Sequence, residues 1–275
     1  GMCGVAMVLA RMEDAPEGSR GLTLFAVPWR NEDGKLNELR IRRLKDKLGV
    51  RAVPSGEVEF NGSQAYVVGD PKKGFYYMME ALNLSRVSTA VASVGIMRRA
   101  YTESLAYASR RNAFEKRLTE YPMIQDTLGK LKAKLHAELI TVFDLISLYE
   151  KVTDGKVSEK ENVLNRLFIA IMKKETAEQA IHFSHEAIEL HGGNGYIEDF
   201  VTPRLLRDAQ VLTVWEGTAN ILALELVRLV NKYQAHKLFI EEMNTRLEKI
   251  PTNHLTEIVR TPLEKLSQDL EKFSQ

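Results

Sequence analysis

The sequence has little of several features that define whole classes of protein. It contains one cysteine, Cys3, in 275 residues, which excludes an internal disulfide and a cysteine-rich zinc site and is typical of the reducing cytoplasm. No apolar run is long enough to span a bilayer. No charged segment precedes a long apolar stretch at the N-terminus, which argues against a secretory signal. We therefore expect a cytoplasmic protein without a membrane span.

An excess of charge of either sign is also absent. Lys and Arg number 38 against 37 Asp and Glu, giving a net charge of +1. Such a balance supplies no general attraction for nucleic acid or for an anionic membrane, so no nucleic-acid partner is expected, although a local basic patch stays open. The composition, 44% hydrophobic and 27% charged, is that of a globular protein with one large or two smaller domains.

The first 70 residues show the patterns of β-strands. Residues 4–10 and 22–27 are short apolar runs separated by a turn-rich linker, and residues 39–42 and 57–60 alternate between apolar and charged side chains. Asn61 and Gly62 predict a tight hairpin before a last strand at 65–68. Four or so strands would leave unpaired edges, so we expect the second part of a larger β domain.

From Gly74 onward the hydrophobic period is helical. Apolar stripes over 87–105 and 124–146 predict two long helices, and a third begins at Ser158 and Glu161, a capping box, and ends at Gly192. A fourth helix follows Thr218, a candidate N-cap. Two shorter amphipathic helices follow near 236–249 and 253–273.

The fold class predicted from these patterns is α+β and mostly α. It consists of a partial antiparallel β domain (1–70), an up-down four-helix bundle (71–234) and a tail of two short helices (235–275). Most of residues 221–230 are apolar, more than one helix face requires. This density predicts a homodimer or homotetramer formed through the helices.

Three short motifs could carry chemistry, and each also has a purely structural interpretation. Arg111 could bind phosphate, or could complement the dipole at a helix C-terminus. The glycines of segment 191–196 could offer backbone N–H groups to a phosphate, or could only stop a helix. Glu216, beside Trp215, could be a general base, or an ordinary acidic residue at a helix start. His191 is expected to pack or cap rather than to bind a metal, and no metal site is predicted.

Taken together and in this order, the motifs resemble the acyl-CoA dehydrogenase family over roughly residues 4–232. Residues 111–114 look like its Arg-x-x-Phe-Gly segment, 191–196 like its Gly-Gly-x-Gly-[Tyr/Phe] turn, and 215–221 like its [Tyr/Trp]-Glu-Gly-Thr-x-x-Ile segment. Segments 21–28, 45–51 and 207–209 add to the likeness. Trp215 and Asn220 favour the branch with very-long-chain and adaptive-response homologues, one of which is associated with DNA protection.

The resemblance implies an FAD-dependent α,β-dehydrogenation of an acyl-CoA thioester, with electron-transfer flavoprotein or a similar protein as acceptor. Glu216 would be the catalytic base. In some branches the base occupies an earlier helix, but Ser85 stands at that position here. The implied cofactor contacts are Arg111, Phe114, Glu189, Gly192, Gly193, Thr218 and Asn220. The implied substrate contacts are Asn83, Ser85, Arg86 and Gly217.

The sequence departs from the family pattern in three respects. Glu115 stands where Gly is usual, and Glu189 where a neutral amide is common; a carboxylate near a pyrophosphate is repulsive unless paired. Nothing matches the family's N-terminal helical domain or the segment that holds the flavin ring. We therefore expect this chain alone to bind FAD weakly or not at all and to be inactive. A non-catalytic oligomeric scaffold is the alternative interpretation, and a nucleic-acid-associated homologue is a third.

Overall fold

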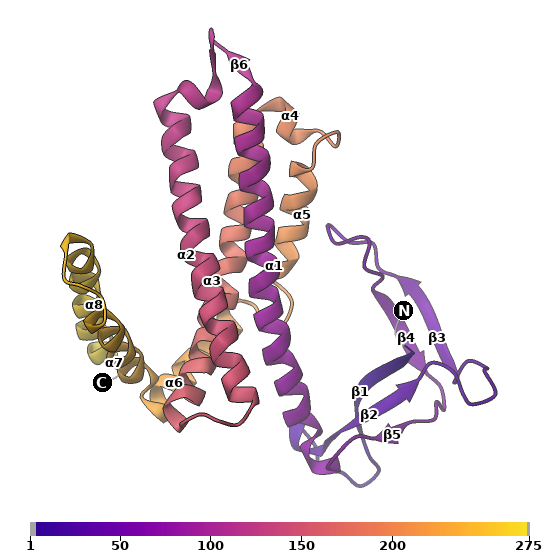
Figure 1. Cartoon of the computed structure of the whole chain (residues 1–275). Helices are drawn as coiled ribbons and strands as arrows, with labels where there is room; N and C mark the ends of the chain where they lie inside the picture. The colour runs from indigo at the N-terminus through magenta and orange to yellow at the C-terminus, as the bar shows by residue number, and fades with distance from the viewer. Residues whose placement is uncertain (1–3, 274–275) are drawn as a thin grey trace. The chain divides into compact units, whose positions relative to one another are not determined.

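The computed structural model describes residues 4–273, which form two compact units divided between Ser85 and Arg86. The boundary lies inside the long helix α1 (Gly74–Arg110). Figure 1 shows the order of the elements along the chain. The mostly helical α+β class predicted from the sequence is confirmed, because small antiparallel sheets precede a series of helices.

The first unit contains two small antiparallel sheets. One has the strand order β1-β2-β5, and the other pairs β3 with β4. Val8 lies opposite Phe25, and Phe25 lies opposite Val67, which fixes the register of the three-stranded sheet. The strands are β1 (Val5–Arg11), β2 (Leu22–Pro28), β3 (Leu39–Leu44), β4 (Gly56–Phe60) and β5 (Tyr66–Val67).

The hairpin predicted at Asn61 and Gly62 is wrong. β4 pairs with β3, and β5 pairs with β2, so these two strands are not partners. A two-residue turn of this kind needs positive φ at both positions, but only Gly62 has it (φ 85°). The buried Asn37 directs the chain instead: its side chain bonds the backbone N and O of Gln64 at 2.8 and 2.9 Å and the Pro28 carbonyl at 2.8 Å.

Helices make up nearly all of the second unit, and local signals set their ends. Pro122 begins α2 at a position where its missing N–H costs nothing. The capping box predicted at Ser158 and Glu161 is confirmed, and Gly192, with φ 59°, ends α3. Beyond α1, the helices are α2 (Pro122–Thr153), α3 (Glu159–His191), α4 (Gly193–Tyr196), α5 (Thr202–Leu212), α6 (Ala219–Tyr233), α7 (Ala235–Glu248) and α8 (His254–Phe273); a small hairpin of β6 (Asn112–Ala113) and β7 (Lys116–Arg117) joins α1 to α2.

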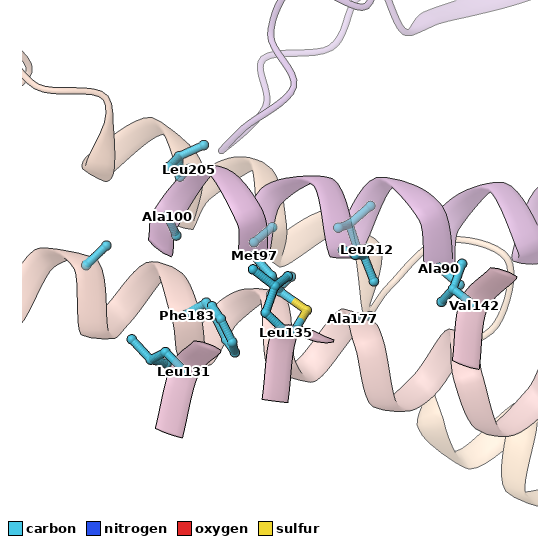
Figure 2. Packing of buried hydrophobic residues seen from close by; sticks show 14 of the residues in the cluster. Ala90, Met97, Ala100, Leu131, Leu135, Val142, Ala177, Phe183, Leu205 and Leu212 are labelled. Carbon is cyan, nitrogen blue, oxygen red and sulfur yellow. The ribbon is translucent and has the colours of Figure 1, made fainter. Parts of the chain in front are cut away.

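The main core of the second unit lies between α1, α2, α3 and α5, with Met97, Leu135, Phe183 and Leu212 at its centre (Figure 2). A second cluster around Leu229 joins α6 and α7 to α3. The helix predicted after Thr218 is present as α6, but the fourth helix of the main core is α5, which the periodicity did not identify. Five of its 11 residues are buried: Thr202, Pro203, Leu205, Ala209 and Leu212.

Within residues 4–273, no helix is both long and apolar enough to cross a membrane.

Candidate functional site

Glu216 lies in the short connection between α5 and α6. After α5, the backbone N–H groups of Val214 and Trp215 still donate to the Val211 carbonyl, at 2.9 and 3.1 Å. Glu216 and Gly217 then both adopt positive φ, 60° and 111°. For glutamate this left-handed conformation is uncommon, and residues held in such regions cluster at functional sites. The connection is therefore a strained bend.

Three side chains from α1 and α3 hold this bend. The Thr89 hydroxyl donates to Oε2 of Glu216 at 2.8 Å. Nε of Arg86 donates to the Glu216 carbonyl oxygen at 2.9 Å, and Nζ of Lys173 donates to the Gly217 carbonyl oxygen at 2.7 Å. The carboxylate and both carbonyls of the bend are thus fixed by groups distant in sequence.

The two cations are buried beside this carboxylate. Lys173 is 1% exposed and Arg86 8%. Burial lowers the pKa of Lys173, while the Glu216 charge raises it and the Arg86 charge lowers it further. Burial likewise lowers the pKa of Arg86, opposed by the charges of Glu225 and Glu216. A half-buried carboxylate flanked by fixed donors is a group that could accept a proton from a bound molecule.

A second cluster lies where α1 and α3 end. Arg111, Glu189, Gly192 and Gly193 line one depression of about 600 Å³, together with His185 and other residues. A Cβ added at Gly192 or Gly193 would meet no atom within 4 Å. The backbone here is therefore open to a ligand.

This lining fits an FAD pyrophosphate in part. The Arg111 guanidinium is exposed, and the open glycine backbone could approach a phosphate closely. Glu189 and Glu186 line the same depression, and their charges would oppose a pyrophosphate. We conclude that the donors fit the group and that the two carboxylates weaken the fit.

His191 and Asn194 support the turn. The His191 ring is buried, stacks on Tyr107 at 4.3 Å between centroids, and has Nδ1 2.7 Å from the Ala187 carbonyl oxygen. The Asn194 amide donates to the Tyr107 hydroxyl at 3.1 Å. His191 is thus a packed side chain. No group of His, Cys, Asp or Glu that could hold a metal occurs in the described part of the chain.

The remaining residues implied by the resemblance are more dispersed. Phe114 is 91% exposed at the tip of the β6–β7 hairpin, where Tyr121 donates its hydroxyl to the Phe114 carbonyl at 2.6 Å. Thr218 and Asn220 are exposed at the start of α6; Thr218 is the N-cap residue, but its side chain makes no capping hydrogen bond. Asn83 and Ser85 lie on the part of α1 that belongs to the first unit.

Sequence reasoning missed Thr89 and Lys173. Thr89 carries no local signal, since a threonine in a helix interior is ordinary. Lys173 did leave one: it interrupts an apolar stripe of α3 between Ile169 and Ala177, both buried. A lysine in a buried stripe needs a partner.

Comparisons with known proteins place the chain in a family. Residues 72–230 match the family model described as the acyl-CoA dehydrogenase C-terminal domain. Acyl-CoA dehydrogenase family member 11 of Caenorhabditis elegans is 36% identical over 280 residues, which cover 98% of this chain and 45% of the relative. The crystal structure of C. elegans ACDH-11 in complex with C11-CoA superposes with a TM-score of 0.91 at 34% identity, over 98% of this chain and 47% of that one.

The protein AidB of Escherichia coli (strain K12) is 30% identical over 256 residues, 91% of this chain and 47% of AidB. The chain thus spans about half the length of these curated relatives. By the match of its family model over more than half of its residues, and by these similarities, the chain belongs to the acyl-CoA dehydrogenase family.

Proposed function

We propose that this chain is the C-terminal part of an FAD-dependent enzyme that removes the α- and β-hydrogens of an acyl-CoA thioester, with Glu216 as the base. The single observation that carries the proposal is the carboxylate of Glu216, held by Thr89 at a bend with positive φ. Such strain is retained where the surrounding structure imposes it, as it does at catalytic sites. The motif around Glu216 matches the family's base segment.

The proposed roles follow from the residues of the bend. Glu216 takes the α-proton of the thioester. Its backbone N–H donates to the thioester carbonyl oxygen and stabilises the negative charge that develops there. FAD, when bound, supplies the acceptor for the β-hydrogen, which leaves as hydride. Gly217 lets the backbone approach the substrate, because it carries no side chain.

The proposed cofactor contacts fall into two groups. Arg111, Gly192 and Gly193 would hold the FAD pyrophosphate, with Glu189 beside them. The others would lie along the rest of the cofactor: Phe114, Thr218 and Asn220. As in the family, Arg111 would act on the cofactor of a neighbouring subunit, so the proposal includes a homodimer or homotetramer. Electron-transfer flavoprotein or a similar protein would reoxidise the flavin.

The proposed substrate contacts lie on α1. Asn83, Ser85 and Arg86 stand at the positions where the family touches the CoA portion. Arg86 differs from the other two because it is 8% exposed and donates Nε to the Glu216 carbonyl. Its contribution to substrate binding would therefore be made mainly through the bend.

The test is Glu216→Gln in a protein that also carries the N-terminal segment present in the relatives. Glutamine has nearly the same shape and keeps the backbone N–H, but it cannot accept a proton at neutral pH. We expect acyl-CoA and FAD to bind, and anaerobic bleaching of the flavin by acyl-CoA to slow by at least about 10²- to 10⁴-fold. The control is Glu178→Gln, an exposed carboxylate paired with Lys174, which should bleach normally. Bleaching of Glu216→Gln at the wild-type rate would show that the base lies elsewhere.

A further inference from the structure

Lys173 is among the largest of the almost completely buried side chains in the described part of the chain. It lies on α3 with Ile169 one turn before it and Ala177 one turn after it, both also buried. An ammonium group in such a place is unfavourable, because burial removes its hydration. Replacing a buried charge with a well-packed apolar side chain often leaves stability unchanged or raises it. Packing alone therefore gives no reason for a lysine at this position.

The contact that Nζ makes gives a reason. Nζ of Lys173 donates to the Gly217 carbonyl oxygen at 2.7 Å, while Nε of Arg86 donates to the Glu216 carbonyl oxygen at 2.9 Å. Two cations from two different helices thus hold two successive carbonyls, which belong to the two successive residues with positive φ. Because a bond from a charged donor is stronger than one from a neutral donor, this pair can hold the bend against its own strain.

We propose that Lys173 is a positioning residue for Glu216, which it holds in the left-handed conformation by binding the Gly217 carbonyl. Any effect of Lys173 on catalysis rests on the proposed function of Glu216, because Lys173 itself touches no reacting atom. Without its Nζ, the Gly217 carbonyl loses this hydrogen bond, and the peptide group that follows Gly217 is held less firmly. The contacts of Thr89 and Arg86 with Glu216 would remain, but the backbone that carries the Glu216 carboxylate and N–H would be held on one side only, and both groups would shift.

The first test uses Lys173→Met in the 275-residue chain, labelled with ¹⁵N-glycine and ¹³C-glutamate. Methionine fills a similar volume and removes the donor. We expect the Gly217 amide resonance to move and the Glu216 ¹³Cα shift to leave its left-handed value. The matched control is Lys174→Met, the adjacent lysine, which is partly exposed and pairs with Glu178 at 2.7 Å. It should leave both signals in place. Unchanged Glu216 and Gly217 signals in folded Lys173→Met would overturn the proposal.

If Lys173→Met fails to fold, a second measurement on the unchanged chain tests the hydrogen bond between Lys173 and the Gly217 carbonyl directly. An ammonium buried on a carbonyl exchanges its protons slowly, so the Lys173 ¹⁵Nζ signal should be observable. We expect a scalar coupling across the hydrogen bond between this nitrogen and the Gly217 carbonyl carbon. A resolved Lys173 signal without such coupling would refute the contact on which the proposal depends.

The catalytic consequence is measured separately, in the protein that carries the N-terminal segment. A small displacement of a catalytic group can cost about 10²-fold in rate, so Lys173→Met should lower kcat by about that factor and change KM little. A displaced bend with unchanged kcat would refute the role in catalysis. If Glu216→Gln proves active while Lys173→Met displaces the bend, the proposed base is wrong and the positioning contact stands. The two failures are thus distinguishable.

Discussion

The three glycines of the 192–195 turn should respond differently to alanine, because the structure gives each a different reason to be glycine. Gly192 has φ 59° and ψ −137°, a conformation that residues with a Cβ rarely adopt, although a Cβ there would meet nothing within 4 Å. At Gly195 a Cβ would lie 2.5 Å from the Ile188 carbonyl oxygen. Gly193 has neither constraint: its surroundings are open, and its φ is not among the positive values of the described residues.

The magnitudes follow from these causes. Gly192→Ala should lower the free energy of unfolding by about 1–3 kcal/mol through backbone strain. Gly195→Ala should cost about 1–3 kcal/mol or more, because the overlap is with backbone, which cannot rotate away. Gly193→Ala should be neutral or should stabilise by up to roughly 0.5–1 kcal/mol, since it begins the short helix α4 and alanine restricts the unfolded chain.

Urea unfolding of the 275-residue chain, followed by far-UV circular dichroism, measures all three. At this size each kcal/mol also corresponds to a shift in Tm of about 2–4 °C. If Gly193→Ala destabilised as much as Gly192→Ala, the assignment of their constraints would be refuted. If it is neutral, Gly193→Ala becomes the variant with which to ask whether this backbone approaches a pyrophosphate, because any loss of binding cannot then come from unfolding.

Three further outcomes are expected. The purified 275-residue chain should bind FAD weakly or not at all, because the segment that holds the flavin ring in the family has no match here; stoichiometric yellow flavin would disprove this. Sedimentation should show a dimer or tetramer, because Ile221 and Leu224 of α6 are 51% and 66% exposed, and a clean monomer at micromolar protein would argue against it. His236 is buried. Its pKa lies below the ordinary 6.5, mainly because burial disfavours the charged ring and also because the positive charge of Lys237 is nearby. The unfolded chain therefore binds a proton at this histidine more readily than the folded state, so the free energy of unfolding should decrease as the pH is lowered below 6.5. His236→Leu should remove this pH dependence. Equal changes of the free energy of unfolding with pH in the two proteins would contradict the prediction.

Local patterns were sufficient for most of the fold. The capping box at Ser158, the stop at Gly192 and the switch in hydrophobic period near Gly74 depend only on neighbours in sequence, and the structure has all three. The prediction of the partner strand of β5 failed because that pairing depends on a distant residue. Asn37 directs residues 61–65 away from a hairpin through bonds to Gln64, 27 positions further along.

The departure at Glu115 has a physical meaning that sequence alone did not reveal. Phe114 and Glu115 form the turn of the β6–β7 hairpin with φ of 51° and 74°. Glycine at the second position would adopt this conformation without strain. Tyr121 compensates, because its hydroxyl donates to the carbonyls of Ala113 and Phe114 at 2.8 and 2.6 Å. The missing glycine is thus offset by a contact within the turn, independent of any cofactor.

The candidate base shows the limit of motif reasoning. The residues around Glu216 identify it as the carboxylate of interest, but they do not explain how a glutamate stays at φ 60°. That explanation lies 130 residues away at Arg86, 127 away at Thr89 and, for Gly217, 44 away at Lys173. Arg86 and Thr89 are not distinctive in their own helix, and Lys173 stands out only as a cation in the buried stripe of α3. Each acquires a role only when α1 and α3 pack beside the connection from α5 to α6. The candidate base can therefore be identified from a short motif, while the contacts that hold its direction are established only in the folded chain.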